Sequence, residues 1–229
     1  MFISCFIMKN DVILIDKPIN WTSFDVVKKI RGLVKKKYAL SKLKVGHAGT
    51  LDPLASGLLI LCTGKKTKEL AKFQNLKKTY LATIKLGFCT DSFDRETEEK
   101  NKKDYKKISR NQINEISKVF FGLQNQIPPK YSALKINGKR AYQKARNNEV
   151  FKLDSRLIHI YSLIIKKIDL PYVEFKVICS KGTYIRSLAH DIGKYLDCGA
   201  YLFNLTRLAI GTHQLDSAIN LEKFKIELD

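Results

Sequence analysis

The sequence predicts one α+β domain, in which strands and helices are mixed without strict alternation. Short apolar runs of strand length stand between segments with helical spacing, but not in the regular βαβ order of a parallel sheet. Of the 229 residues, 45% are apolar and 28% are charged, which is a globular composition. A chain of this length buries one sizeable core or at most two small ones, and no repeat or compositional break marks a linker.

In the first half of the chain, apolar runs predict strands and helical spacing predicts helices. Strands are expected at residues 11–16, 58–62 and 78–88. Helices are expected at residues 24–34 and 65–73. Thr22 or Ser23 can cap the first helix, since a hydroxyl there accepts a hydrogen bond from the first turn. The Gly-rich residues 45–52 are expected to form a loop.

The second half continues in the same mixed manner. The charged residues 91–107 have no periodicity and are expected to form an exposed loop, to which we assign no function. Helices are expected at residues 109–121, 138–146 and 183–196. Strands are expected at residues 131–136, within 151–168, at 172–179, and at 202–210, the last as a strand or a short helix.

The composition excludes several classes of protein. No apolar run reaches the roughly 18 residues needed to span a bilayer. Residues 1–8 are too short for a signal peptide, and Met8 is an alternative start to Met1. The five cysteines are scattered without a C-x-x-C pair and the four histidines are dispersed, so we expect neither a disulfide framework nor a metal site. The sequence is typical of a cytoplasmic protein.

The net charge of +20 makes polyanions the expected partners, nucleic acid first and an anionic membrane second. The 34 lysines against 8 arginines are also what an A+T-rich genome would encode, so charge alone does not decide the function. A membrane-binding protein would need a basic amphipathic helix with a clean apolar face, and none is clear.

The most unusual segment is GHAGTLDPLASGLL at residues 46–59, with three glycines and one proline. Pro53 biases Asp52 toward an extended backbone, so a stiff loop presents the Asp52 carboxylate at the edge of an apolar strand. Such a carboxylate is a candidate nucleophile or base. An aspartate that only caps a turn is the alternative interpretation.

This segment resembles the catalytic loop of the TruB family of tRNA pseudouridine synthases, and further motifs similar to those of that family lie before and after it, in the family's order, over residues 11–210. They are IDKP at 15–18 with WTS at 21–23, KTY at 78–80, LG at 86–87 with TD at 90–91, PPKYSALK at 128–135 with GKRAY at 138–142, SKGTYIRSL at 180–188, and GA at 199–200 with LTR at 205–207. One motif alone could be chance, but the ordered set is specific.

The resemblance implies a pseudouridine synthase-like fold, a mixed and mainly antiparallel sheet with flanking helices and loops around a central cleft. It implies an enzyme that flips the uridine at position 55 out of the tRNA T loop and isomerises it to pseudouridine, without a metal or cofactor. We expect one catalytic domain over residues 1–229, with a core at about 10–210 and a short tail at 211–229. The tail is too short for the PUA domain that many members carry.

By the same resemblance, Asp52, Tyr80 and Arg186 are the catalytic residues. Arg186 would keep the Asp52 carboxylate ionised, and Tyr80 would stack against the flipped base. Whether Asp52 acts as nucleophile or base stays open. The structural alternatives are a core tyrosine at position 80 and a surface ion pair at Arg186.

The resemblance also implies residues that bind the RNA substrate. His47 would fill the space left by the flipped nucleotide, Leu205 would line the pocket and Tyr184 would pack beneath it. Gly46 and Gly49 shape the same loop. Lys17 and the segment from Lys135 to Arg146 would grip the backbone of the RNA stem. For His47, a turn histidine bonded to its own loop is the alternative.

The expected partner is the tRNA T stem-loop, bound by a monomer that needs no protein partner. Two rivals remain: a guide-RNA-dependent rRNA pseudouridine synthase subunit, which works with partner proteins, and a non-catalytic tRNA-binding or folding protein on the same scaffold. Ser187, His190 and Asp191 offer the residue types of a hydrolase, but they crowd on one helix, so we do not assign a catalytic triad.

Overall fold

The computed structural model describes residues 10–136 and 138–228, which form two compact units. Unit 1 contains residues 10–80 and 206–228, and unit 2 contains residues 81–205. The chain passes between the units within strands β4 (Lys78–Leu86) and β10 (Ala200–Ile210). The expectation of one catalytic domain concerns the whole chain and stays a prediction, and the choice between Met1 and Met8 lies outside the described residues.

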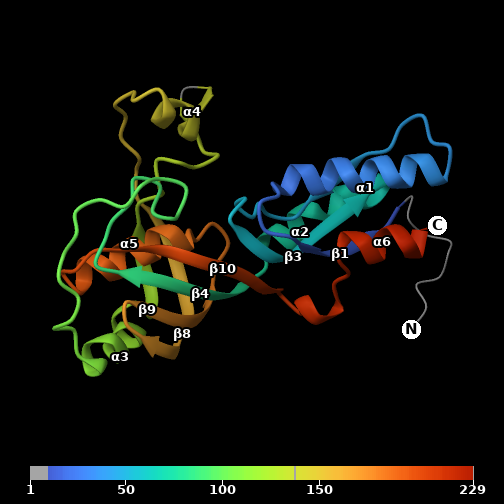
Figure 1. The fold of residues 1–229 in the computed structure, drawn as a ribbon. Helices are drawn as coiled ribbons and strands as arrows, with labels where there is room; N and C mark the ends of the chain where they lie inside the picture. The colour runs from blue at the N-terminus through green and yellow to red at the C-terminus, as the bar shows by residue number, and fades with distance from the viewer. Residues whose placement is uncertain (1–9, 137, 229) are drawn as a thin grey trace. The chain divides into compact units, whose positions relative to one another are not determined.

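Unit 1 is built on a small antiparallel sheet (Figure 1). Strand β1 (Val12–Lys17) pairs with β3 (Ala55–Thr63), with Ile13 opposite Leu61. The short strand β2 (Val45–His47) also pairs with β3, and β11 (His213–Gln214) pairs with the end of β10. Its helices are α1 (Ser23–Lys37), the 3₁₀ helix η1 (Gly64–Glu69), α2 (Leu70–Asn75), η2 (Leu215–Ser217) and α6 (Leu221–Leu228).

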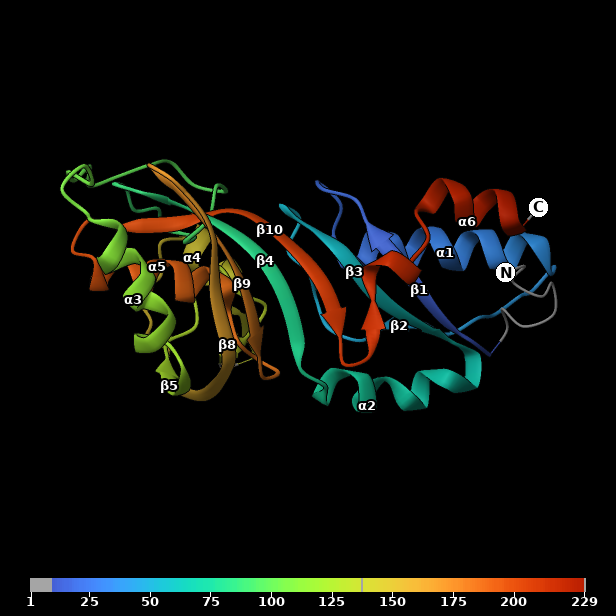
Figure 2. The same ribbon diagram turned by 90° about the horizontal axis from the view of Figure 1, so that it is seen from below.

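Helices cover the unit 1 sheet on both faces, with α1 and α6 on one side and α2 on the other (Figure 2). Residues Ile13, Ile15, Leu59 and Leu61 pack with Val26, Val27, Ile30, Val34, Phe224 and Leu228. The alternate residues Leu58 and Ile60 pack with Ala48 and Ile210, against Leu70 and Phe73. Strand β3 therefore reads as a continuous apolar run because both of its faces are buried.

The expected first helix is confirmed and its cap is Thr22. The Thr22 hydroxyl accepts from the Asp25 amide at 3.0 Å, and the Asp25 carboxylate accepts from the Thr22 amide at 3.1 Å. The loop expected at residues 45–52 is wrong at its start, because residues 45–47 form strand β2, paired with the end of β3. The segment after Ile210, expected as a tail, contains α6, whose Phe224 is fully buried.

Unit 2 contains the strand order β10-β4-β9-β8-β5. Strands β8 (Arg156–Asp169) and β9 (Tyr172–Cys179) form a long antiparallel hairpin, and β5 (Gly122–Gln126) pairs with β8 at the edge. Helix α3 (Arg110–Val119) packs on β8, and the amphipathic helix α5 (Ile185–Tyr195) buries Leu188, Ala189 and Ile192.

The expectations for unit 2 succeeded where the pattern was strong. Ser109 caps α3 in a second capping box with Gln112, and the segment at 202–210 is a strand rather than a helix. The strand expected at 131–136 is wrong for its first four residues, since only β6 (Lys135–Ile136) forms, paired with β7 (Lys139–Arg140) ahead of α4 (Ala141–Arg146). Strand β5 was not predicted because its sequence, GLQNQ, is mostly polar.

The predicted fold class is confirmed: the structure is α+β, with a mixed and mainly antiparallel sheet and flanking helices. Among the described residues, no helix is both long and apolar enough to cross a membrane. In this part of the chain, Cys62, Cys89, Cys179 and Cys198 form no disulfide bond.

Candidate active site

In unit 1, the loop that carries Asp52 connects β2 to β3 and is fixed by main-chain hydrogen bonds. The Asn20 amide donates to the Pro53 carbonyl at 2.8 Å, and the Ala55 amide donates to the Asp52 carbonyl at 3.1 Å. Asp52 itself is half-buried. The loop therefore presents the Asp52 carboxylate from a defined backbone, as the sequence predicted.

The buried guanidinium of Arg207 fastens both ends of this loop. Its Nε donates to the Leu58 carbonyl at 2.7 Å, Nη2 to the Gly49 carbonyl at 3.1 Å and Nη1 to the Thr50 carbonyl at 3.4 Å. Arg207 is 1% exposed, so these carbonyls replace water as its partners. Arg207 is part of the LTR motif, but no role could be predicted for it from the sequence, because its partners lie about 150 residues away in the chain.

Ser23, the first residue of α1, holds the residue before Asp52. Its hydroxyl accepts from the Leu51 amide at 2.8 Å and donates to the Leu51 carbonyl at 3.1 Å. Because Thr22 caps the helix, the neighbouring Ser23 hydroxyl is left to bind Leu51. Both residues of this contact are buried.

Lys17 is an internal cation, and the expectation that it grips the RNA stem is wrong in this structure. Its side chain is fully buried, and Nζ donates to the carbonyls of Pro18 at 2.8 Å and Trp21 at 2.6 Å. Burial lowers the pKa of Lys17 to about 8, and attraction to Asp52 opposes that shift. Lys17 thus stabilises the turn before α1 and interacts electrostatically with Asp52.

Packing explains the first glycine expected in substrate binding, and backbone conformation explains the second. A Cβ on Gly46 would lie 2.6 Å from Leu70 Cδ1. Gly49 has a φ of +113°, which favours glycine, and its carbonyl accepts from Arg207. Between them, His47 lies in β2, where burial and the Arg207 charge lower its pKa and favour the neutral imidazole.

Tyr80 lies on the buried face of β4, where the alternation of the sequence placed it. Two residues earlier, the Lys78 ammonium donates to the carbonyls of Phe73, Gln74 and Leu76 at the end of α2. The K-x-Y motif therefore combines a lysine that caps the helix C-terminus with a tyrosine on the same strand face.

In unit 2, Arg186 is buried near the start of α5 and held by three groups. Its Nη1 donates to the Tyr131 carbonyl at 2.9 Å and the Ser92 carbonyl at 3.3 Å, and its Nε lies 3.6 Å from Asp94 Oδ2. The Asp94 carbonyl accepts from the hydroxyls of Thr90 and Ser92, which fixes this segment. Arg186 is thus a buried, oriented cation and not a surface residue.

The other expected residues of unit 2 lie in different surroundings. Tyr184 exchanges two hydrogen bonds with the Gln126 side chain, and the Arg156 guanidinium lies 4.4 Å from the centre of its ring. Leu205 is buried on β10. Lys135 is exposed on β6. Ser187 donates to the Ile127 carbonyl at 2.7 Å, which agrees with the absence of a triad assignment.

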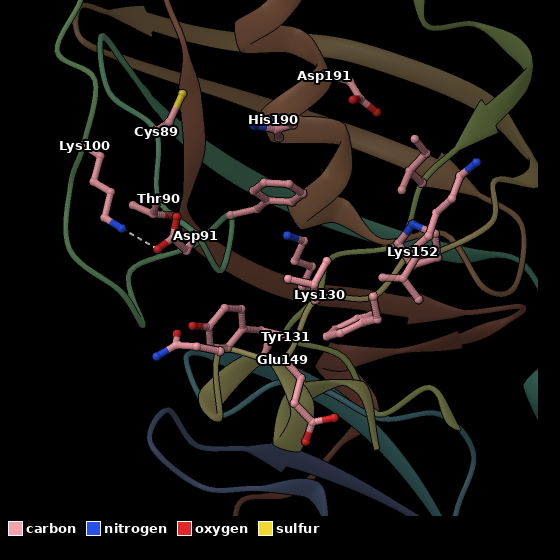
Figure 3. Close-up of a pocket in the computed structure, with 18 of the residues that line it drawn as sticks. Cys89, Thr90, Asp91, Lys100, Lys130, Tyr131, Glu149, Lys152, His190 and Asp191 are labelled. Atoms are coloured by element: carbon pink, nitrogen blue, oxygen red, sulfur yellow. Dashed lines mark hydrogen bonds and ion pairs between the residues drawn. The ribbon is translucent and has the colours of Figure 1, made fainter. Parts of the chain in front are cut away.

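Unit 2 also contains a pocket of about 750 Å³ that the sequence did not predict (Figure 3). Segments from the 87–109 loop, the chain after β5, the chain after α4 and helix α5 line it. Asp91, Lys100, Lys130, Tyr131, Lys152, His190 and Asp191 are among its residues. The pocket adjoins Arg186 through Tyr131, and its lysines and aromatic rings are the residue types that contact phosphates and stack on bases.

On the α5 side of this pocket, burial shifts the pKa values of two neighbouring groups in opposite directions. Burial lowers the pKa of His190 to about 4, with a smaller contribution from Lys194, and the ring stacks on Phe93 with centroids 3.9 Å apart. Burial raises the pKa of the neighbouring Asp191 to about 6. Within the described residues, no group of three or more histidines, cysteines or acidic residues is placed to hold a metal ion.

Residues 35–185 match the family profile described as TruB family pseudouridylate synthase (N terminal domain). The chain belongs to the TruB family. It is 47% identical to tRNA pseudouridine synthase B of Parabacteroides distasonis, over 93% of this chain and 91% of that protein. It is 45% identical to the protein of the same name from Phocaeicola vulgatus, over 96% of this chain and 94% of the relative.

Two solved structures are also similar to this chain. A structure of an H/ACA RNP bound to a substrate RNA containing 2′-deoxyuridine has 27% identity and a TM-score of 0.68 over 96% of this chain. A Cbf5-Nop10-Gar1 complex has 28% identity and the same TM-score. This chain spans 53% and 54% of those two chains, about half of their length.

One residue of this TruB family member that sequence reasoning missed is Asp94. It lies in the charged segment to which no function was assigned, yet it is buried beside Arg186. The signal was its place three residues after the TD motif at 90–91, in a stretch otherwise rich in exposed charges. A buried acid is rare without a partner, so Asp94 belongs to the candidate site as the group that orients Arg186.

Proposed function

We propose that this protein is a tRNA pseudouridine synthase that converts the uridine at position 55 of the T loop to pseudouridine, with Asp52 as the catalytic carboxylate. The observation that carries the proposal is the 42–47% identity to proteins named tRNA pseudouridine synthase B, over 92–96% of this chain. The rigid presentation of Asp52 by Ser23 and Arg207 supports it independently.

The reaction requires an ionised carboxylate next to a base removed from its helix. The bond from ribose C1′ to uracil N1 breaks, C1′ bonds to C5, the proton on C5 leaves and N1 gains a proton. No oxidant, reductant or second substrate is consumed. In unit 1 the attraction to Asp52 opposes the lowering of the Lys17 pKa by burial, so a buried cation interacts with this carboxylate.

We assign the remaining groups in the same proposal. Arg186 is the cationic catalytic group that unit 2 supplies, and Asp94 holds the Arg186 guanidinium in place. Tyr80 stacks on the flipped uracil, while His47, Tyr184 and Leu205 contact the surrounding nucleotides. Lys135 on the β6–β7 hairpin contacts the RNA backbone, since it is exposed and beside Arg140.

The second candidate is a guide-RNA-dependent synthase subunit, because the H/ACA RNP and Cbf5 structures share this fold. Their identity to this chain is 27–28%, well below that of the tRNA pseudouridine synthase B relatives. We therefore favour a monomer that acts on tRNA in the cytoplasm without a guide RNA or a protein partner.

The test uses the protein alone and an unmodified tRNA transcript carrying tritium at C5 of uridine. Pseudouridine formation exchanges the C5 hydrogen, so tritium release measures the reaction, and chemical mapping locates the product. We expect release that approaches one equivalent per tRNA and a product at position 55. A transcript with cytidine at position 55 is the control and should release none. Release only after a guide RNA is added would support the second candidate instead.

A further inference from the structure

The exposed face of α1 carries a concentration of positive charge that the active site does not explain. Between Asp25 and Asp52 the sequence has eight lysines and arginines and no acidic residue. Five of these, Lys28, Lys29, Arg31, Lys35 and Lys36, lie at helical positions away from the buried residues of α1; Lys28, Lys29 and Lys36 are exposed, and Arg31 and Lys35 are partly exposed. We call these five basic residues the α1 stripe.

The stripe is not neutralised by the elements beside it. Within the described residues, Lys28, Lys29, Arg31 and Lys36 form no ion pair. The only acidic residue of α1, Asp25, is hydrogen-bonded to Thr22 in the capping box and, among these four cations, attracts Lys28. The neighbouring helix α6 carries Glu222 and Glu227 with Lys223 and Lys225, so its own charges balance.

The same helix distinguishes between two kinds of polyanion. A helix that binds a membrane surface buries a stripe of apolar side chains in the lipid. The apolar side of α1 is already used, because Val26, Val27, Ile30 and Val34 are buried in the unit 1 core. Phe24 alone is a large exposed apolar residue on the outer face. A charged face without an apolar stripe suits the phosphate backbone of a nucleic acid.

The direction of α1 connects the stripe to the candidate active site. Ser23 at its first turn is hydrogen-bonded to Leu51, next to Asp52. The helix has 15 residues, so Lys36 lies about 20 Å along its axis from that contact. This distance is beyond the reach of the flipped base but within the span of a bound tRNA.

We propose that Lys28, Lys29, Arg31 and Lys36 form a second tRNA-binding surface, which contacts the phosphate backbone from about 8 Å to about 20 Å along α1 from the Ser23–Leu51 contact. The proposal rests on the proposed function for the identity of the RNA. The contacts are electrostatic and independent of sequence, so they raise affinity and position the tRNA without selecting the uridine.

The test replaces these four residues together by Gln, which keeps helix propensity while removing charge. The matched control replaces Lys106, Lys107, Arg110 and Lys166, three exposed lysines and one exposed arginine of unit 2, by Gln. Binding of unmodified tRNA is measured by filter retention at several salt concentrations, without reference to catalysis. The α1 variant should bind about tenfold or more weakly at low salt, with a logarithmic salt slope smaller by about three.

The following outcomes would contradict the proposed tRNA contact of α1 or separate it from the proposed function. An equal loss in the α1 variant and the matched control would show that only net charge matters, and would overturn the proposal. Retained tRNA affinity, with loss of binding to phosphatidylserine vesicles, would assign the stripe to a membrane instead. Because the assay reads binding, a protein that binds tRNA through α1 but forms no pseudouridine would refute the proposed function and leave this surface standing.

Discussion

Ser23 shows how one hydroxyl can set the position of a candidate catalytic group that it does not contact. It satisfies both main-chain groups of Leu51, and Leu51 is 3% exposed, so water cannot replace the hydroxyl. Arg207 does the same for the carbonyls of Gly49 and Thr50. The position of Asp52 therefore depends on residues from α1 and β10 that reach the loop backbone.

We predict that Ser23→Ala lowers kcat about 10- to 100-fold with little change in KM for tRNA, because a displacement of about 1 Å at a reacting group can cost that much. Unfolding should become easier by about 1–3 kcal/mol, since two buried polar groups lose their partner. Single-turnover conversion of tRNA and thermal unfolding measure the two effects.

Two control variants distinguish an effect on the position of Asp52 from an effect on protein stability. Ser109→Ala removes the capping hydroxyl of α3 and costs about 1 kcal/mol, but it should leave kcat unchanged. Ser23→Thr keeps the hydroxyl and should restore most of the rate. Equal kcat values for Ser23→Ala and Ser109→Ala would contradict a positioning role for Ser23.

At the scale of the elements, strand β3 approaches β10 so closely that only glycine fits at position 57. Gly57 has a φ of +99°, and a Cβ there would lie 2.5 Å from the Arg207 carbonyl oxygen and 2.9 Å from its nitrogen. Gly57→Ala should therefore cost about 3 kcal/mol or more of unfolding free energy, measured by urea denaturation.

A second glycine of unit 1 provides the matched control. Gly32 is an exposed helical residue of α1, and among the described residues no atom lies within 4 Å of a Cβ placed there. Gly32→Ala should raise stability by about 0.5–1 kcal/mol through helix propensity. If both variants shifted the urea midpoint in the same direction, the close approach of β10 to Gly57 would not explain the loss of stability in Gly57→Ala.

Helix α5 carries two titrations of opposite sign. The pKa of His190 is about 4 when folded and 6.5 in the unfolded chain, so the unfolded state binds more protons between these pH values. Stability should fall as pH falls through that window. The unfolding free energy should decrease less between pH 7 and pH 4.5 in His190→Gln than in the wild type. The difference should be about 1–2 kcal/mol, allowing for partial solvent screening, as measured by denaturation at the two pH values.

Asp191 gives the opposing result in the same helix. Its pKa is about 6 when folded and 3.8 in the unfolded chain, so the folded state binds more protons between these values and gains stability as pH falls. The unfolding free energy of Asp191→Asn should therefore decrease more between pH 7 and pH 4.5 than that of the wild type. If the two variants changed the acid loss in the same direction, burial would not explain these shifts.

For the whole molecule, local patterns predicted the elements, while long-range contacts decided several residue roles. The first helix, the alternation of β4 and the loop of Asp52 followed from spacing, capping and Pro53. Asp94 could not be assigned a role because its partner, Arg186, lies 92 residues later in the chain. Lys17 was misassigned because its burial depends on carbonyls of the turn that follows it. Pairing with β8 makes the polar segment β5 a strand, which no local signal indicates.

The most direct test of the account is the single-turnover rate of Asp52→Asn on tRNA that is bound to saturation. Asn keeps the size of the side chain and removes its charge, so we predict retained tRNA binding and a loss of about 10³-fold or more in pseudouridine formation at position 55. A variant that converts the T-loop uridine at a rate near that of the wild type would contradict the central role of Asp52.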